Sequence, residues 1–434
     1  MRAPRSLVML ALVAPTLCCV TVAAPAYAVE ADCKDINVSD PEQFSTERPS
    51  LPLAEMEIDQ AWARLAKMKK QPGEGVVVAV IDSGVASAAP IDVVGRVDAG
   101  NLKPEPEDYH GTAVAGLIAG KPRPGDPVAQ AVGIAPFARI FDVQVYDNAL
   151  APEPAPGQTP EESPITVANV VLGLDKVIEA VPTLGIRIVN MSMTVTHDPA
   201  IEARIAQLWE LGVVVVAPTG NRPGEDVPVP GLPASYAEGY QAGEDAAPFI
   251  FPAGYPDVLA VNASMGGLDS GVDPMSYVME NSKTKVAAPT ASAVSYSVRG
   301  ESCVLNDPAT SYAAAEVSGV LAVLQSAYDE PINASISRLL ATADGRQDIP
   351  NPLVGAGEVQ ALDALTRPLV LDEDGDNAGE GSVMQEPQVL EVPEEPDDVL
   401  ASTRRNAVWW GLLGGGVLLL ALVLRPVLAR RRRG

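Results

Sequence analysis

Three short segments of the chain carry the side chains that serine-based acyl transfer needs. Asp82 ends an apolar run that is typical of a buried strand, and His110 and Ser311 each open a stretch of small residues with helical character. An acylating serine needs a base to take its proton, and that base needs an acid that fixes its tautomer and stabilises the imidazolium. The three residues together therefore predict a Ser-His-Asp catalytic site.

A fourth residue could complete this chemistry. Gly220 and Asn221 directly follow an apolar run at 213–217. A side-chain amide at this point could donate a hydrogen bond to the oxyanion of a tetrahedral intermediate. The plainer interpretation of Asn221 is an ordinary asparagine turn, and the three segments described above favour the oxyanion role.

Each candidate residue also has an ordinary structural explanation. Asp82 could be a plain strand-end carboxylate, and Ser311 could be a helix cap, because serine favours that position. The only histidine besides His110 is His197, which falls in a loop between a predicted strand and a predicted helix, so we expect it to be solvated. The sequence contains no His-Glu-x-x-His and no glycine-rich phosphate loop. We therefore expect neither a metal nor a cofactor.

The residues around these segments alternate between short apolar runs and amphipathic stretches. Such alternation predicts βαβ units, with a mostly parallel sheet that helices cover on both faces. Ligands of these sheets bind at the carboxyl ends of the strands, which is where Asp82 and Asn221 fall. The predicted strands are 76–81, 138–145, 186–191, 213–217 and 258–261, and the predicted helices are 58–69, 112–119, 167–181 and 199–211.

From about residue 75 to 365, the chain resembles a subtilisin-like serine protease. The motifs Val80-Ile81-Asp82-Ser83-Gly84 and His110-Gly111-Thr112 match that family residue for residue, and the order Asp, His, Ser is the order found in subtilisin. The resemblance implies an α/β fold of three layers, α/β/α. It also implies that Asp82 orients, His110 is the general base and acid, Ser311 is the nucleophile and Asn221 is the oxyanion donor.

The segment Asn190-Met191-Ser192 resembles the strand that lines the substrate cleft in that family. We expect the substrate-binding residues to be Ser192, Met193, Pro218 and Thr219. The last two would form part of the wall of the primary specificity pocket, which suggests small apolar substrate side chains. The family pattern Gly-Thr-Ser-x-Ala-Ala-Pro departs here at Ala309 and Ala315, and Thr194 stands where the cleft strand often has glycine. Alanine at 309 adds a Cβ where the substrate backbone should pass, so slow or narrowly selective activity is expected.

Both ends of the chain carry patterns typical of export and membrane anchoring. Residues 1–28 hold two arginines, an apolar run and a small-x-small site in that order, which predicts a secretory signal cleaved after Ala28. Residues 407–424 form an uninterrupted apolar stretch, close to the minimum length for spanning hydrocarbon. More arginines follow this stretch than precede it, which places the carboxyl end in the cytoplasm. The alternatives are a retained helix at the amino end and a buried core helix at the carboxyl end.

The part of the chain between these two ends is strongly acidic. The formal net charge is −26, and every acidic residue lies between residues 29 and 403, which argues against a nucleic-acid partner. Residues 368–403 are acidic without any basic residue and contain proline and glycine, as expected of an extended stalk. The predicted parts are a signal peptide (1–28), an amino-terminal extension (29–75), a peptidase domain (76–367), a linker (368–406), a transmembrane helix (407–424) and a cytoplasmic basic tail (425–434).

This layout resembles that of mycosins, the membrane-anchored subtilases of actinobacterial type VII secretion systems. The resemblance implies a single-pass protein of the cell membrane with an extracytoplasmic catalytic domain, a secreted protein as substrate and the type VII membrane complex as partner. Two functions stay open: a serine endopeptidase that works through an acyl-enzyme, and a structural subunit that braces the secretion complex. The complete triad favours the first. The extension is short for an inhibitory prodomain, so we expect it to be retained and packed on the protease.

Two cysteines, Cys33 and Cys303, remain once the signal peptide is removed. An exported domain meets an oxidising compartment, where two leftover thiols have one intramolecular pairing available. We expect a disulfide that fastens the extension beside the helix of Ser311. The alternative is two buried, unpaired thiols.

Overall fold

The computed structural model describes eleven stretches of the chain, which fall into two units, residues 1–382 and 383–434. The predicted signal peptide and residues 369–400 of the predicted linker lie outside the described residues. The described residues are 31–37, 39, 46, 48–122, 132–148, 165–224, 231–264, 273–345, 349, 351–368 and 401–431.

The first unit is built on a seven-stranded, wholly parallel sheet with the strand order β2-β3-β1-β4-β5-β6-β7. All five predicted strands are present in it, and two strands that were not predicted, β2 and β7, complete it. A separate antiparallel pair, β8 with β9, was not predicted. The strands are β1 Val77–Asp82, β2 Val93–Asp98, β3 Arg139–Gln144, β4 Ile188–Asn190, β5 Val214–Pro218, β6 Val258–Ser264, β7 Val286–Pro289, β8 Ala293–Tyr296 and β9 Ser302–Leu305.

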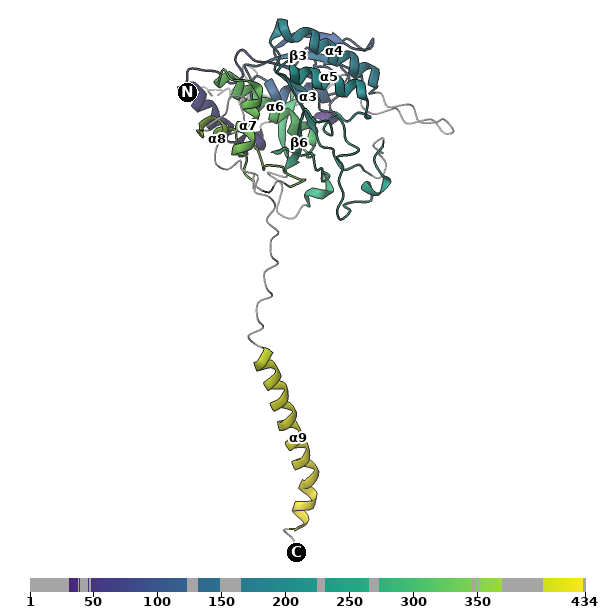
Figure 1. Cartoon of the computed structure of the whole chain (residues 1–434), viewed down its shortest axis with the longest axis vertical. Coiled ribbons are helices and arrows are strands. Elements are labelled where there is room, and N and C mark those ends of the chain that lie inside the picture. The colour runs from purple at the N-terminus through teal and green to yellow at the C-terminus, as the bar shows by residue number, and fades with distance from the viewer. Residues whose placement is uncertain are drawn as a thin grey trace, which may run out of the picture. The chain divides into compact units, whose positions relative to one another are not determined.

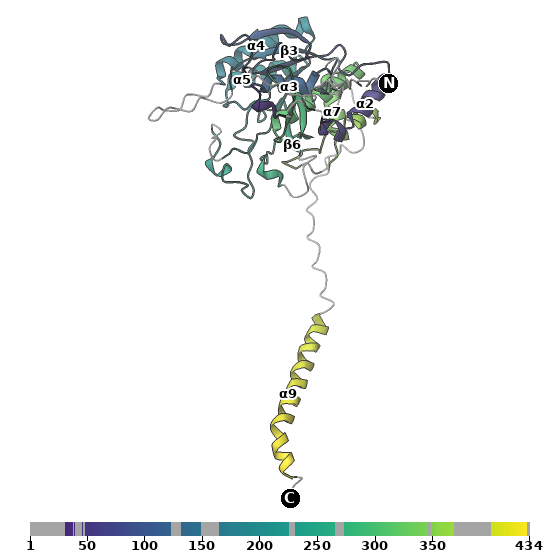
Figure 2. The same ribbon diagram turned by 180° about the vertical axis from the view of Figure 1, so that it is seen from behind.

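Helices cover both faces of this sheet, as Figure 1 and the view from behind in Figure 2 show. Helices α3 and α6 share one buried cluster with Val78 and Val80 of β1, whereas α4 and α5 share another with Val77, Ala79 and Ile81. Successive side chains of a strand point to opposite faces, so an apolar run without alternation buries both. The predicted three-layer α/β/α fold is confirmed. The helices of this unit are α1 Leu51–Glu55, α2 Ile58–Lys67, α3 His110–Ala119, α4 Val167–Leu184, α5 Pro199–Glu210, α6 Thr310–Ala327, α7 Ile332–Thr342 and α8 Ala361–Thr366, with the short 3-10 helices η1 Cys33–Asp35, η2 Ala234–Tyr236 and η3 Pro274–Ser276.

The strand order determines where a site can form. The chain adds β2 and β3 on one side of β1 and then continues with β4 on the other side. In such sheets, ligands bind in the crevice at the carboxyl ends of the strands where the direction reverses. Asp82 is the last residue of β1 and Asn190 the last of β4, so both end at this crevice.

Much of the described part of residues 31–75 packs against the sheet and its helices rather than forming a separate body. Met56, Ile58 and Leu65 of this segment are fully buried in the cluster that also contains α3 and α6. The indole nitrogen of Trp62 donates to the backbone oxygen of Ile134 at 2.8 Å. The amphipathic pattern that predicted a helix at 58–69 therefore corresponds to α2, which ends at Lys67 and faces the core.

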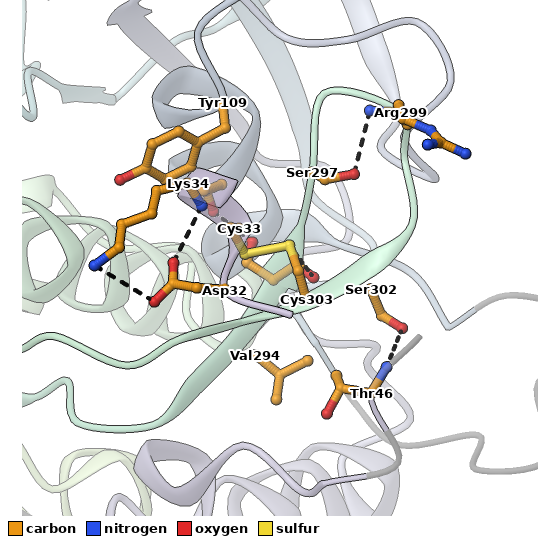
Figure 3. The surroundings of a disulfide bond; sticks show 12 residues. Asp32, Cys33, Lys34, Thr46, Tyr109, Val294, Ser297, Arg299, Ser302 and Cys303 are labelled. Atoms are coloured by element: carbon orange, nitrogen blue, oxygen red, sulfur yellow. Dashed lines mark hydrogen bonds and ion pairs between the residues drawn. A yellow bond between two sulfur atoms is a disulfide. The ribbon is translucent and has the colours of Figure 1, made fainter. Parts of the chain in front are cut away.

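A disulfide joins this segment to β9 of the separate antiparallel pair. Cys33 and Cys303 are bonded, both are fully buried, and 270 positions separate them in sequence. Beside the bond, the backbone nitrogen of Val304 donates to the oxygen of Ala31 at 3.1 Å, and Asp32 forms an isolated bridge with Val304. Figure 3 shows the bond, with the side chains of Asp32 and Lys34 beside the ring of Tyr109. The alternative of two unpaired thiols is thereby removed.

Helix α6 carries a buried acid that has no compensating partner. Glu316 is 1% exposed, and its Oε2 atom makes no hydrogen bond within the described residues. Burial raises the pKa of Glu316 well above its ordinary value, and the negative charges of Glu358 and Glu55 raise it further. The folded protein therefore holds this proton more tightly than the unfolded chain does.

Replacing Glu316 with glutamine should remove a pH dependence of stability. In the wild type, the free energy of unfolding falls as the pH rises from the ordinary value of 4.5 through the raised pKa, because the folded state binds the extra proton. The E316Q variant cannot titrate at this position, so its stability relative to wild type should increase with pH. Denaturant titrations at several pH values measure this, with the exposed Glu210→Gln as the matched control. A constant difference between E316Q and wild type across pH would contradict it.

The second unit contains helix α9, Ala401–Arg431. Its described side chains include leucines and tryptophans that are exposed, among them Trp410 at 73% and Leu419 at 66%. Within the described residues, no helix combines the length and hydropathy that crossing a membrane requires. The transmembrane helix predicted at 407–424 falls within α9 and stays a prediction.

Candidate active site

Asp82 and His110 are hydrogen-bonded to each other at the carboxyl edge of the sheet. The Nδ1 atom of His110 lies 2.9 Å from Oδ1 and 3.1 Å from Oδ2 of Asp82. His110 is the first residue of α3, and the carboxylate of Asp108 accepts its backbone N–H at 2.9 Å. The next residue, Gly111, must be glycine, because a Cβ there would lie 2.5 Å from the backbone oxygen of Gly84. This close approach of helix to strand brings the imidazole to the carboxylate.

The surroundings of His110 favour its protonated form. Burial lowers the pKa of the imidazole, but the charge and hydrogen bond of Asp82, together with the charge of Asp108, outweigh it, so the pKa of His110 is raised above 6.5. The side chain keeps 18% of its surface exposed, whereas Asp82 is fully buried. Because Nδ1 is bonded to Asp82, Nε2 is the ring nitrogen left to face a substrate or a nucleophile.

Ser311 is the second residue of α6 and is 8% exposed. The alternative that it caps this helix is wrong, because the N-cap is Ala309. The hydroxyl of Ser192 donates to the backbone oxygen of Ser311 at 2.7 Å and to Oδ1 of Asn190 at 2.8 Å. Residues at the end of β4 thus hold the first turn of α6 in place.

The side-chain oxygen of Asn221 is engaged by Thr310, which fixes the orientation of the amide and leaves its nitrogen to donate to a ligand. Its Oδ1 accepts the backbone N–H of Thr310 at 2.8 Å and the hydroxyl of Thr310 at 2.9 Å. The neighbouring Arg222 forms a buried ion pair with Glu244, and its backbone N–H donates to Tyr277 at 2.8 Å. These contacts hold the loop after β5 against the start of α6, with the Asn221 side chain beside the first turn of that helix.

One cavity of about 310 Å³ brings together three of the four predicted catalytic residues. His110, Ser311 and Asn221 all line it, and Asp82 lies behind His110. Two residues of the amino-terminal extension, Asp32 and Lys34, line it as well. The other lining residues are Tyr109, Arg222, Ser276, Tyr277, Leu305, Asn306, Asp307, Pro308, Ala309 and Tyr312.

The predicted substrate-binding residues lie behind this cavity rather than in its wall. Ser192 is 3% exposed and directs its hydroxyl to Ser311 and Asn190, and Met193 packs in the cluster under α4 and α5. Pro218 ends β5, and the hydroxyl of the fully buried Thr219 donates to Val261 at 3.2 Å. None of the four is among the lining residues. Their role in binding substrate stays a prediction.

His197 lies away from this cavity, as the sequence indicated. Its exposed side chain packs against Phe251, with ring centroids 4.8 Å apart, and against Tyr255 at 5.6 Å. It makes no contact with the triad among the described interactions.

Three tyrosines at the site were not predicted. The hydroxyls of Tyr109 and Tyr312 lie 3.2 Å apart, and the ring of Tyr312 is tilted against His110 with centroids 6.0 Å apart. Tyr146 donates to Oδ1 of Asp82 at 2.8 Å. A signal was available for each: the first two adjoin the predicted histidine and serine in sequence, and Tyr146 comes two residues after a strand neighbouring β1, at the same edge.

The comparisons with known proteins agree with this geometry. The model of the subtilase family (Peptidase_S8) matches residues 73–357. Mycosin-1 of Mycobacterium tuberculosis (strain ATCC 25618 / H37Rv) is 29% identical over 314 residues, which cover 68% of this chain and 69% of that protein. Mycosin-3 of the same organism is 30% identical over 405 residues, covering 83% and 81%.

A solved structure shows the same likeness in three dimensions. MycP3 protease from the type VII (ESX-3) secretion system matches with a TM-score of 0.54 at 27% identity, covering 78% of this chain and 92% of that one. The family match spans more than half of the chain, and Mycosin-3 is matched over most of both lengths. The chain therefore belongs to the subtilase family of serine proteases and, within that family, is a mycosin-like subtilase.

Proposed function

We propose that this protein is a membrane-anchored, extracytoplasmic serine endopeptidase that cleaves secreted protein through an acyl-enzyme. The observation that carries the proposal is the bond between His110 and Asp82 behind a cavity that Ser311 and Asn221 also line. The proposed roles are base and acid for His110, orienting acid for Asp82, nucleophile for Ser311 and oxyanion donor for Asn221.

The geometry supports the following sequence of steps. The Oγ atom of Ser311 attacks the scissile carbonyl while Nε2 of His110 accepts its proton, and Asp82 stabilises the imidazolium through Nδ1–H. The oxyanion of the tetrahedral intermediate accepts a hydrogen bond from the free amide nitrogen of Asn221. His110 then donates its proton to the leaving amine, which breaks the C–N bond and leaves Ser311 acylated. Attack by water, with His110 again as base, releases the acid and restores Ser311.

A fluorophosphonate probe tests the nucleophile directly. The probe phosphonylates a serine whose hydroxyl is activated by a neighbouring base, so peptide mapping of labelled wild-type protein should place the adduct on Ser311. Ser276 lines the same cavity and its hydroxyl bonds to the backbone of Asp273, so it serves as an internal control. Folded protein that is not labelled, or is labelled on Ser276 instead, would overturn the proposed mechanism.

Asn221→Ala should lower kcat by about two to three orders of magnitude, the effect of removing the corresponding donor in subtilisin. The amide nitrogen stabilises charge that develops in the transition state, so KM should change much less. Steady-state kinetics on a chromogenic peptide measure both constants. Asn221→Asp keeps an acceptor for Thr310 but cannot donate, so it should be equally impaired. An unchanged kcat in either variant would remove Asn221 from the site.

We infer that the extension stays part of the mature protein. Asp32 and Lys34 line the catalytic cavity, and the disulfide of Cys33 holds them there. The ammonium group of Lys34 donates to the carboxylate of Asp307, which lines the same cavity, at 2.6 Å. Sequencing the amino terminus of protein purified from its own membrane should give a start at Val29. A start near Gly73 would show that the extension is removed.

We further propose that the protein works at a type VII secretion complex, held to the membrane by residues 407–424 with the carboxyl end in the cytoplasm. The solved relative MycP3 is named as a protease of such a system. The chain's arginine-flanked apolar segment and acidic middle support anchoring with an outside catalytic domain. Co-purification of secretion subunits with the full-length chain tests the association.

A second function, bracing the secretion complex with weak proteolysis, is favoured by one observation. Ala309 lines the cavity at the N-cap of α6, where the related motif has glycine, so its Cβ narrows the path of a substrate. The two functions differ in what a Ser311→Ala strain shows. If the Ser311→Ala strain keeps an intact secretion complex but no longer secretes processed protein, the peptidase function is supported. If that strain secretes normally and the complex disassembles only when the whole chain is deleted, the bracing function is supported.

A further inference from the structure

The hydroxyl of Tyr146 bonds directly to the carboxylate that orients His110. It donates to Oδ1 of Asp82 at 2.8 Å and lies 3.5 Å from Nδ1 of His110. The same oxygen of Asp82 accepts the backbone N–H of Ser83 at 2.8 Å. Tyr146 is 1% exposed, so this bond is made away from solvent.

The sheet register places Tyr146 there. Asp82 at the end of β1 pairs with Gln144 at the end of β3, and the backbone N–H of Val145 donates to the oxygen of Asp82 at 2.9 Å. The next residue therefore leaves the strand beside the carboxylate. The ring of Tyr146 packs in the cluster that contains Ile81, which fixes the direction of its hydroxyl.

The hydroxyl of Tyr146 stays protonated at neutral pH, so it acts as a neutral donor. Burial raises the pKa of its hydroxyl well above the ordinary value of 10, and the negative charges of Asp82 and Asp108 raise it further. A phenol that stays protonated disperses part of the negative charge of the carboxylate to which it donates. Less charge on Asp82 means less stabilisation of the His110 imidazolium.

We propose that Tyr146 is a positioning residue that lowers the basicity of His110 through Asp82. This rests on the proposed function, because only there does His110 act as a base. The other groups near the imidazole are the carboxylate of Asp108 and the rings of Tyr109 and Tyr312, and the same cavity is lined by the charged residues Asp32, Lys34, Arg222 and Asp307. The charge of Asp108 favours the imidazolium, whereas the hydroxyl of Tyr146 offsets part of the charge of Asp82 and so keeps His110 neutral over a wider pH range.

The pKa of His110 can be measured without any proteolysis. The chain has two histidines, so NMR titration of histidine-labelled protein gives two resolved imidazoles, and His197 serves as internal reference. Tyr146→Phe should raise the pKa of His110 by about half a unit to one unit, because the carboxylate regains charge.

A matched control and a second variant separate tuning from packing. Tyr312→Phe removes another buried hydroxyl near His110, but one that bonds to Tyr109 and not to Asp82, so it should shift the pKa of His110 far less. If Tyr146→Phe does not fold, 3-fluorotyrosine placed at position 146 keeps the shape of the ring. Its more acidic hydroxyl is a stronger donor, so the pKa of His110 should fall.

The variants at position 146 should also move the acidic limb of kcat/KM against pH, whereas Tyr312→Phe should move it far less. That limb reports the free enzyme's essential base, so Tyr146→Phe should shift it to higher pH by the same amount as the NMR titration gives. An unshifted His110 pKa in folded Tyr146→Phe protein would overturn the proposal and leave the protease function standing. A shifted pKa without Ser311-dependent cleavage would uphold the coupling and overturn the function instead.

Discussion

Replacing Ser311 with alanine should lower kcat for peptide cleavage by about 10⁶-fold, the loss measured when subtilisin loses its nucleophile. The reason lies in the geometry: His110 and Asp82 remain bonded in the variant, but they have no hydroxyl to activate. The variant should still hydrolyse the peptide about 10³ to 10⁴ times faster than the uncatalysed reaction in water, because the oxyanion donor and the binding surface remain. Single-turnover and steady-state assays on one peptide measure the loss.

The comparison variant for this loss is Ser276→Ala. Ser276 is an exposed serine in the wall of the same cavity, and its hydroxyl bonds to the backbone of Asp273. It should retain activity close to wild type, since it touches neither His110 nor Asn221 among the described hydrogen bonds. Ser311→Ala protein that folds normally and still cleaves at a rate near wild type would show that another residue is the nucleophile.

Removing the disulfide should produce the largest loss of stability. Bonding Cys33 to Cys303 closes a loop of 270 positions, and the chain-entropy model gives up to about 5 kcal/mol for such a loop, although many bonds deliver less. Cys33→Ala with Cys303→Ala should therefore lower the midpoint of chemical unfolding of full-length protein in detergent. Residues 31–37 should detach from the rest of the protein first, because α2 keeps its own buried contacts through Ile58 and Leu65.

A reductant provides the control for this prediction. Wild-type protein under reducing conditions should approach the stability of the double variant, and the double variant should not respond to the reductant. Limited proteolysis should then cut near Lys34 in both cases, since the bond no longer holds this segment against the cavity. Equal unfolding midpoints with and without the bond would mean that packing alone holds the extension.

The buried strands and helices of the sheet were predictable from sequence, because an element that packs in the core needs apolar residues at a characteristic spacing. The five predicted strands are apolar runs buried on both faces, and α4 and α5 have the spacing of helices that cover a sheet. Strands β7, β8 and β9 have four residues each. Strand β4 is shorter still, with three residues, but it lies inside the longer apolar run 186–191 that predicted it. A short run carries no usable periodicity of its own, and its pairing partner decides whether it is a strand. Strand β2 was missed because its residues are only partly buried and include Arg96 and Gly95.

The sequence by itself determined the fold class, the identity of the triad candidates and the expectation that Cys33 pairs with Cys303. Asp82, His110 and Ser311 stand in local motifs whose residue types follow from backbone geometry, such as the glycine that the Gly111–Gly84 contact requires. Each of the three motifs is a run of a few adjacent residues, so it is visible in one dimension, although the contact between Gly111 and Gly84 forms only in the folded chain.

Only the tertiary structure decided what lies around those residues. Three hydrogen bonds formed only in the fold: from the hydroxyl of Ser192 to the backbone oxygen of Ser311, from the hydroxyl of Thr310 to the side-chain oxygen of Asn221, and from the hydroxyl of Tyr146 to the carboxylate of Asp82. The fold also brought Asp32 and Lys34 of the extension to the catalytic cavity, more than 270 positions from Asp307. Such contacts depend on strand register and on the direction of each side chain, which arise when distant segments pack together and which no local pattern of residue types encodes.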